Sequence, residues 1–375
     1  MRAREAFLRG SAAAVVAALW FGSHACAQPR VDSVDAYLRR EMTARRIPGL
    51  AVAVIQKGRI EKLGAYGDAN VEFHVPTTPA TLFQIASITK AFTGVAVMMQ
   101  VEAGRLRLDE SVGRYLDSLP PEWRGVTVRQ LVNHTSGLPD IVDNPYTVHL
   151  VAKTVPEALR VLERRPFEFA SGTKWSYNQT NYMLLGMLIE KVTGLTYDQF
   201  CLANFLRPLG LTTAAFGDAR IIIPNRATGY TMFRFDADHP RRIDQPEALH
   251  YEFEPMLYSA AALNISVADL AAWIVALENG KFIRRASLED IWTPATVGGE
   301  PYQRPPGSPF TSYGLGWVLL PRSVHRAVGG SGGLRAAFFV YPEDSLAVVI
   351  LTNLQGANPE SLVEGVANLY FARKR

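Results

Sequence analysis

Cysteine is scarce in this chain, with two residues among 375, Cys26 and Cys201. Cys26 falls in an N-terminal segment that we expect to be removed, so one thiol remains and no internal disulfide can form. The fold must then be stable through its own core, for which 48% hydrophobic residues are sufficient. Cys201 lies in the apolar stretch 200–203, and we expect it to be a buried packing residue rather than a nucleophile.

The sequence also shows none of the patterns typical of nucleic-acid-binding, repeat, metal-binding or nucleotide-binding proteins. The 39 basic and 35 acidic residues give a net charge of +4, with no long run of one sign. A nucleic-acid groove needs a continuous basic stripe, so we expect no nucleic-acid partner. No repeat of 20–50 residues indicates a solenoid or propeller. The histidines show no metal-binding spacing and no nucleotide-binding glycine loop is present, so we expect neither a metal nor another cofactor.

Residues 1–27 have the pattern of a secretory signal peptide. A basic start is followed by an apolar stretch over 11–22, and Ala25-Cys26-Ala27 supplies small residues for cleavage. A retained anchor is disfavoured because the apolar stretch is short, and lipid attachment at Cys26 is disfavoured by the residues before it. We therefore expect a secreted or periplasmic protein with no stable membrane insertion after cleavage.

Apolar runs near both ends of the chain predict strands, and short turns join them in pairs. Such hairpins favour antiparallel pairing. Amphipathic or capped segments outside these pairs predict helices over residues 32–46 and from Pro359 onward. The strands are expected over residues 50–55, 60–66, 336–341 and 346–351.

The middle of the chain is mostly helical in pattern. Helices are expected over 88–103, 154–164, 181–192 and 266–280. We predict an α+β fold, in which an antiparallel sheet built from both termini is flanked by helices and carries a largely helical inserted lobe. The domain would span residues 28–375. Its sheet lobe would comprise about 28–80 and 310–375 and its helical lobe about 81–309, with a cleft between them as the place for a site.

The segment Ser87-Ile88-Thr89-Lys90 is the first candidate for chemistry. It opens a predicted helix, so the three-residue spacing places Lys90 one turn above Ser87 on the same face. The amine can lower the pKa of a neighbouring base, or accept a proton itself when it is neutral. The helix N-terminus and the backbone N–H of Ser87 can stabilise an oxyanion. We expect Ser87 to be a nucleophile.

Two other segments match short catalytic patterns. Ser171 and Lys174 have the same spacing as Ser87 and Lys90, but their surroundings predict a turn instead of a helix start. Gly329–Gly333 matches the Gly-x-Ser-x-Gly elbow, which requires a following helix and a later histidine. A strand follows instead and no histidine comes after Ser331. A glycine-rich strand that a ligand backbone approaches closely explains this segment better.

These motifs together resemble the serine β-lactamase superfamily, and most closely its class C β-lactamases, family VIII esterases, D-amino-acid amidases and DD-carboxypeptidases. The resemblance covers about residues 48–353. Residues 83–90 are similar to the first family motif, which implies Ser87 as the acylated nucleophile and Lys90 as its partner. Residues 175–186 are similar to the second, Tyr-x-Asn, motif. This implies Tyr177 as a general base whose pKa is lowered by Lys90.

The second motif departs from the family pattern. Gln179 stands where the family usually has asparagine, and either Gln179 or Asn178 is expected to hydrogen-bond Lys90 or a substrate carbonyl. Two further segments, 131–138 and 313–317, also resemble family segments. We expect structural roles for both, including that of a loop histidine with satisfied hydrogen bonds for His134.

The third motif falls on Gly330-Ser331-Gly332, and its first position lacks the family's lysine, histidine or tryptophan side chain. Ser331 is expected to face the substrate, and Arg335 is a candidate to supply the missing positive charge. The backbone N–H of Gly333 is expected to be the second oxyanion donor beside that of Ser87, since this role needs no side chain.

The sequence therefore predicts a secreted serine hydrolase that forms an acyl-enzyme on Ser87 and cleaves small ester or amide substrates. D-amino-acid peptides and β-lactams are among the candidate substrates, but the loss at Gly330 favours an esterase or amidase over a dedicated β-lactamase. The alternative is a penicillin-binding-like module that binds cell-wall peptides or a partner with little turnover. Acyl transfer to another alcohol is a further option.

Overall fold

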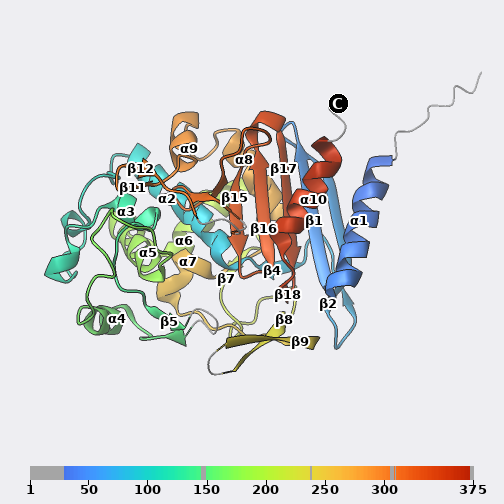
Figure 1. The fold of residues 1–375 in the computed structure, drawn as a ribbon, viewed down its shortest axis with the longest axis horizontal. Helices are drawn as coiled ribbons and strands as arrows, with labels where there is room; N and C mark the ends of the chain where they lie inside the picture. The colour runs from blue at the N-terminus through green and yellow to red at the C-terminus, as the bar shows by residue number, and fades with distance from the viewer. Residues whose placement is uncertain (1–28, 145–148, 237–238, 305–307, 309, 372–375) are drawn as a thin grey trace, which may run out of the picture.

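A computed structural model describes residues 29–144, 149–236, 239–304, 308 and 310–371 (Figure 1). The predicted signal peptide lies outside these residues. An eight-stranded antiparallel sheet in the order β13-β14-β15-β16-β17-β1-β2-β3 forms the centre of the fold. Its strands are β1 (Gly49–Gln56), β2 (Arg59–Asn70), β3 (Val75–Pro76), β13 (Ser312–Tyr313), β14 (Val318–Leu320), β15 (Ala327–Gly332), β16 (Ala336–Tyr341) and β17 (Leu346–Thr352).

The two ends of the chain meet in the middle of this sheet. Strand β1 pairs antiparallel with β17, with Leu50 opposite Thr352 and Gln56 opposite Leu346. The hairpins β1–β2 and β16–β17 complete the central strands. The α+β fold with an antiparallel sheet built from both termini is therefore confirmed.

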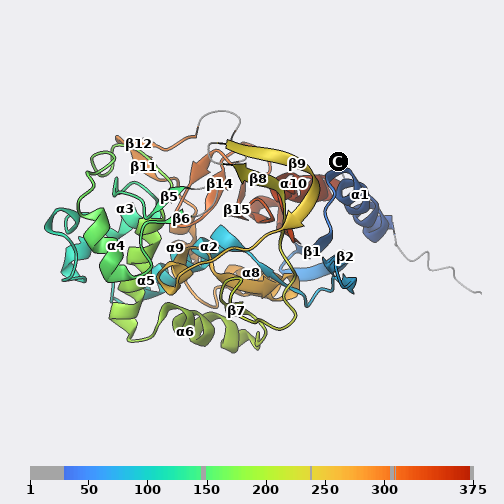
Figure 2. The same cartoon turned by 90° about the horizontal axis from the view of Figure 1, so that it is seen from below.

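Both faces of the sheet are covered by helices, which explains why β1 is apolar at every position. Leu50, Val52 and Val54 face the cluster that contains α1 (Pro29–Arg45) and α10 (Pro359–Phe371). The intervening Ala51, Ala53 and Ile55 face the opposite cluster, which contains α2 (Thr89–Glu102) and α8 (Val267–Glu278). Figure 2 shows α1 and α10 on one side of β1 and α8 on the other. Burying both faces removes the polar alternation of a half-exposed strand.

The chain between the two halves of the sheet is rich in helices, as the sequence predicts. The remaining helices are α3 (Val128–Val132), α4 (Val155–Leu162), α5 (Gln179–Thr193), α6 (Tyr197–Cys201), α7 (Tyr258–Ala261) and α9 (Arg285–Ile291). Short strands here are β4 (Leu82–Gln84), β5 (Val142–Asn144), β6 (His149–Leu150), β7 (Ala215–Phe216), β10 (Leu263–Ser266), β11 (Thr296–Val297) and β12 (Glu300–Pro301).

One element of this region has no counterpart in the sequence prediction. A hairpin of β8 (Tyr230–Asp236) and β9 (His239–Ala248) pairs in parallel with β18 (Leu354–Gln355), directly after β17. This pairing brings the hairpin close to the end of the main sheet (Figure 2). In the part of the chain that the structure describes, no helix is long and apolar enough to cross a bilayer.

Candidate active site

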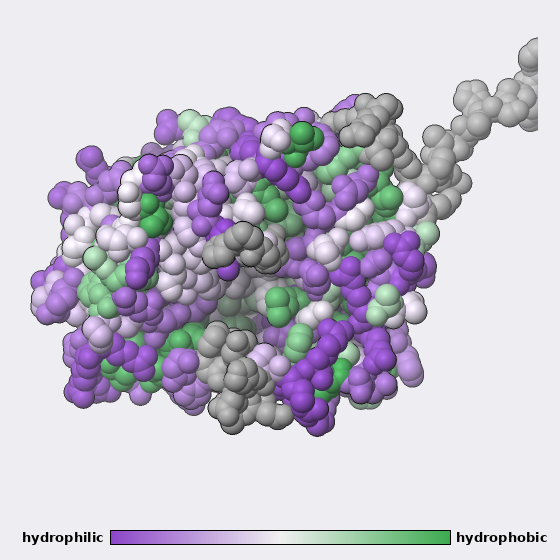
Figure 3. Space-filling view, viewed as in Figure 1, coloured by the Kyte–Doolittle hydropathy of each residue, from purple (hydrophilic) through white to green (hydrophobic). Residues whose placement is uncertain are grey.

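Ser87 lies in a tight turn that leads into α2. The 3₁₀ turn Ala86–Ile88 precedes the helix, and Ala86 has a φ of 45°, in the left-handed region that costs a non-glycine residue about 1 kcal/mol. Two hydrogen bonds fix the turn: Ile85 N–H donates to Leu263 O over 3.0 Å, and Thr89 Oγ1–H donates to Ala86 O over 2.7 Å. The turn holds Ser87 at the edge of a cavity of about 550 Å³, and Figure 3 shows this face of the molecule hollowed near its centre.

Lys90 is buried one turn further along, with 1% of its surface exposed. Its ammonium donates to Gln179 Oε1 over 2.9 Å and to Ala260 O over 3.0 Å, and lies 4.8 Å from the centre of the Tyr177 ring. Burial disfavours the charged form and lowers the pKa of Lys90 to about 7, although the Asp140 carboxylate opposes this shift. The amine is therefore divided between its neutral and charged forms near neutral pH.

The half-buried Tyr177 lies in the segment just before α5, and its side chain contacts Ser87. Its hydroxyl interacts with the side chains of Ser87 and Gln179, and both contacts lower its pKa. Burial has the larger effect, so the pKa of Tyr177 lies above its ordinary value of 10.0. The expectation that Lys90 lowers this pKa is wrong, because the ammonium faces the aromatic ring and the buried environment penalises the phenolate.

Gln179, and not Asn178, is the amide that contacts Lys90. Asn178 caps α5: its Oδ1 accepts from Asn181 N–H over 3.0 Å and its Nδ2 donates to Leu138 O over 2.7 Å. Both ends of the Asn178 side-chain amide are therefore occupied by hydrogen bonds within the protein, and the expected substrate contact of Asn178 is wrong. Gln179 lines the cavity, and its longer side chain reaches the amine.

Asp140 is a residue of this site for which the sequence predicted no chemical role. Its Oδ1 accepts from Gln179 N–H over 3.0 Å, and its side chain lines the cavity. Burial raises the pKa of Asp140 to about 6, while hydrogen bonds from two backbone N–H groups lower it. A single aspartate in a loop has no distinguishing pattern, so it could be found only from the fold.

Strand β15 is glycine-rich because it packs against the turn that carries Ser87. A Cβ atom on Gly332 would lie 2.0 Å from Ile85 O, and one on Gly330 would lie 2.7 Å from Cε1 of Phe338. A Cβ on Gly333 would lie 3.2 Å from that of Ala86, so the Gly333 backbone lies next to the Ser87 turn. Gly333 lines the cavity together with Ser87, where both backbone N–H groups are candidate oxyanion donors.

Ser331 points away from this cavity. Its neighbours Gly330 and Gly332 face the α2 side of the sheet, so the alternation of a strand directs Ser331 to the α10 side. There its hydroxyl donates to Oε1 of Glu360 in the first turn of α10. The expected substrate contact of Ser331 is therefore wrong.

Arg335 does line the cavity, but it is almost fully buried, with 4% of its surface exposed. Its Nη2 donates to Gln84 Oε1 over 2.8 Å, and its guanidinium lies 4.7 Å from the centre of the Tyr251 ring. Arg335 thus brings positive charge to the cavity wall from a fixed position.

The rest of the cavity wall is mainly apolar. Phe233 and Pro240 come from the β8–β9 hairpin, and Ala260 and Ala261 come from α7. Phe253, Leu257 and Leu334 also line the cavity. The wall fits an apolar group attached to a carbonyl near Ser87.

Several other residues considered from the sequence have no direct contact with the Ser87 cavity. His134 is fully buried and packs 4.5 Å from the Tyr177 ring, measured between centroids, which fits a structural role. Its Nδ1 accepts from Asn178 N–H over 3.1 Å, but its buried Nε2 has no hydrogen-bond partner among the described residues, so the expectation of a fully satisfied ring is wrong. Ser171 Oγ–H donates to Ser136 O in a turn, away from any helix start. Cys201 is buried, and burial raises the pKa of its thiol. Among the described residues, no group of three or more His, Cys, Asp or Glu side chains could hold a metal ion.

Comparison with known proteins agrees with this fold. Protein flp of Staphylococcus aureus (strain COL) is 25% identical over 92% of this chain and 67% of its own length. The octameric penicillin-binding protein homologue from Pyrococcus abyssi matches with a TM-score of 0.76 and 26% identity, covering 91% of this chain and 77% of that one.

The structure of EstCE1, described as a hydrolase with promiscuous acyltransferase activity, matches in fold. Its TM-score is 0.72 and its identity is 23%, over 90% of this chain and 98% of its own. The family model "Beta-lactamase" matches residues 34–371, which is most of the chain. This protein therefore belongs to the beta-lactamase family.

Proposed function

We propose that this protein is an exported serine hydrolase that forms an acyl-enzyme on Ser87 and cleaves ester or amide carbonyls. The observation that carries the proposal is the buried Lys90 amine, with a pKa of about 7, one helical turn from Ser87 and against the ring of Tyr177. A buried lysine without an ion-pair partner is costly for a fold, and such groups cluster at functional sites.

In the acylation step, Ser87 Oγ forms a bond to the carbonyl carbon of the substrate. The neutral amine of Lys90 takes the hydroxyl proton, and the Tyr177 hydroxyl, which contacts Ser87, relays it. The carbonyl oxygen becomes an oxyanion that accepts hydrogen bonds from the backbone N–H groups of Ser87 and Gly333. The bond to the leaving alcohol or amine then breaks, and the leaving group takes the proton from Lys90.

In the deacylation step, water attacks the acyl-enzyme carbonyl by the same route. Lys90 accepts a proton from the water through Tyr177, the tetrahedral intermediate returns to the oxyanion donors, and the bond to Ser87 Oγ breaks. Ser87 regains the proton and a carboxylic acid is released. An alcohol that replaced the water would give a new ester, which is the acyl-transfer variant of this reaction.

The apolar cavity supports small esters with an apolar acyl group as substrates. Gly330 carries no charge, and a side chain there would collide with Phe338. This disfavours substrates that need a cation at that position, as β-lactams and D-amino-acid peptides do in the related enzymes. Export is proposed from the signal-peptide pattern in the sequence of residues 1–27.

The test compares wild-type protein with Ser87→Ala and Lys90→Met on p-nitrophenyl esters, D-amino amides, D-Ala-D-Ala peptides and a cephalosporin. We expect ester hydrolysis that falls to the uncatalysed level in both variants while their thermal unfolding remains cooperative. Hydrolysis that persists in Ser87→Ala contradicts the proposal.

A second candidate is a penicillin-binding-like module with little turnover, favoured by the absence of a charged side chain at Gly330. For this candidate we expect no Ser87-dependent hydrolysis of any substrate in the panel, together with a raised melting temperature in the presence of a D-Ala-D-Ala peptide.

A further inference from the structure

A second cavity lies on the other side of Arg335 and Tyr251 from the Ser87 cavity, since these two residues line both. It has a volume of about 330 Å³. Its walls come from β4, the loop over 219–229, residues 249–251 and the end of the main sheet at 352–353. Ser87, Lys90 and Tyr177 do not line it, so its function is separate from the acylation chemistry.

The second cavity is lined by basic side chains and by no acidic ones among the described residues. The basic side chains are those of Arg226, His250 and Arg335. Arg226 is engaged by backbone oxygens, with Nη1 donating to Asp218 O over 2.6 Å. The carboxylate of Asp218 is itself in an ion pair with Arg220. Within the described chain, neither Arg226 nor Arg335 forms an ion pair with a carboxylate.

Arg335 in particular has unused hydrogen-bonding capacity. Its Nη2 is held by Gln84, and its buried Nε, which has no hydrogen-bond partner among the described residues, lies beside Gly333 of the Ser87 cavity. Its Nη1 lies on the side of Gly229, which lines the second cavity. Burial lowers the pKa of Arg335, which reflects the cost of a buried cation without a carboxylate counter-ion. Burial also lowers the pKa of the half-buried Arg226, although the nearby Asp218 carboxylate opposes this shift. An anion in the second cavity would offset that cost.

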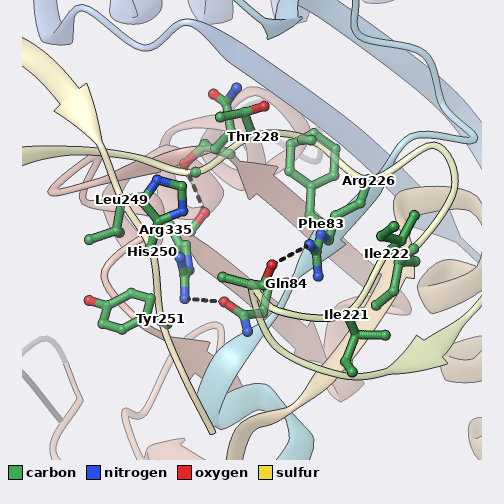
Figure 4. A pocket seen from close by; sticks show the side chains of 16 residues that line it. Phe83, Gln84, Ile221, Ile222, Arg226, Thr228, Leu249, His250, Tyr251 and Arg335 are labelled. Atoms are coloured by element: carbon green, nitrogen blue, oxygen red, sulfur yellow. Dashed lines mark hydrogen bonds between the residues drawn. The ribbon is translucent and has the colours of Figure 1, made fainter. Parts of the chain in front are cut away.

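The opposite wall of the second cavity is apolar. Figure 4 shows Arg335, His250 and Tyr251 on one side of the cavity and Ile221 and Ile222 on the other. Ile222 is 94% exposed and Ile221 is 47% exposed, so both present apolar surface to water at the rim. A ligand chain that covered them would remove this surface from water.

We propose that the second cavity binds a small carboxylate that carries an apolar chain of medium length. The carboxylate would lie against Arg335 and Arg226, and the chain would extend along Ile221 and Ile222. A volume of about 330 Å³ is near the lower limit of ligand pockets, which fits such a compact ligand. Binding there does not depend on the reactivity of Ser87.

The experiment is calorimetric titration of octanoate into Ser87→Ala protein, so that no turnover can interfere. We expect one site per chain. Octanamide, which has the same chain and no charge, should bind at least about tenfold more weakly, because the charge-assisted hydrogen bonds are lost. Arg335→Met should weaken octanoate binding to a similar degree.

Two further variants keep the test decisive if Arg335→Met does not fold. Ile222→Ser changes an exposed side chain and should weaken octanoate about fivefold, because it removes part of the apolar contact. Arg105→Met removes an exposed arginine remote from the second cavity and should leave the affinity unchanged. Octanamide binding as tightly as octanoate, octanoate affinity unaltered in Ile222→Ser, or no octanoate binding up to its solubility would each overturn the proposal.

Discussion

The pH dependence of ester hydrolysis follows directly from the burial of Lys90. The pKa of this amine is lowered from 10.5 to about 7, because burial disfavours its charged form. If neutral Lys90 is the base, kcat/KM must rise with pH and level off above the pKa. The neutral fraction grows from about 9% at pH 6 to about 91% at pH 8, so kcat/KM should rise about tenfold over this interval and little beyond it.

The assay is hydrolysis of p-nitrophenyl butyrate under first-order conditions from pH 5.5 to 9, followed in a pH-stat because the absorbance of p-nitrophenol itself changes with pH. Ser87→Ala provides the background rate. In Asp140→Asn, the carboxylate that raises the pKa of Lys90 is gone, so the midpoint of the profile should move to lower pH.

The reasoning is refuted by a profile without a plateau. A base with a much higher pKa, such as the Tyr177 phenol, would give a tenfold rise with each pH unit, or about 100-fold between pH 6 and pH 8. That result would mean that Tyr177 loses the proton first and that Lys90 remains charged.

Three further predictions concern other positions. Gly330→Ala should destabilise the protein by about 1–3 kcal/mol, measured by urea unfolding, because its Cβ would lie 2.7 Å from the Phe338 ring, whereas Gly125→Ala, with open space around it, should not. Ser331→Ala should keep kcat/KM for esters within about twofold of wild type, because the Ser331 hydroxyl donates to Glu360 on the other face of the sheet. A loss of activity as large as that in Ser87→Ala would contradict this placement. Cys201 should react with iodoacetamide only after unfolding, as detected by mass spectrometry, and rapid labelling of the folded protein would contradict its burial.

The fold could be predicted where hydrophobic patterns are strong. The continuous apolar run in β1 follows from burial on both faces, and the observed strands and long helices differ from the expected ones by a few residues at their ends. The β8–β9 hairpin could not be predicted, because β9 (HPRRIDQPEA) is mostly polar and forms by pairing with β8, which in turn pairs with β18. Such long-range pairing leaves no local pattern.

The site was predictable to a different extent at each residue. Ser87 and Lys90 share one helical turn, so their spacing alone indicates a pair. Tyr177 joins them only through the packing of α5 against α2. The direction of Ser331 depends on which face of β15 is turned toward α2, and the burial of Arg335 depends on contacts distant in sequence.

The most direct test of the acyl-enzyme is mass mapping after incubation with a fluorophosphonate probe, which is attacked by an activated serine. We predict one label per chain, on the peptide that contains Ser87, and no label in Lys90→Met although this variant retains Ser87. Labelling of another residue, or no labelling of folded wild-type protein, would contradict the account.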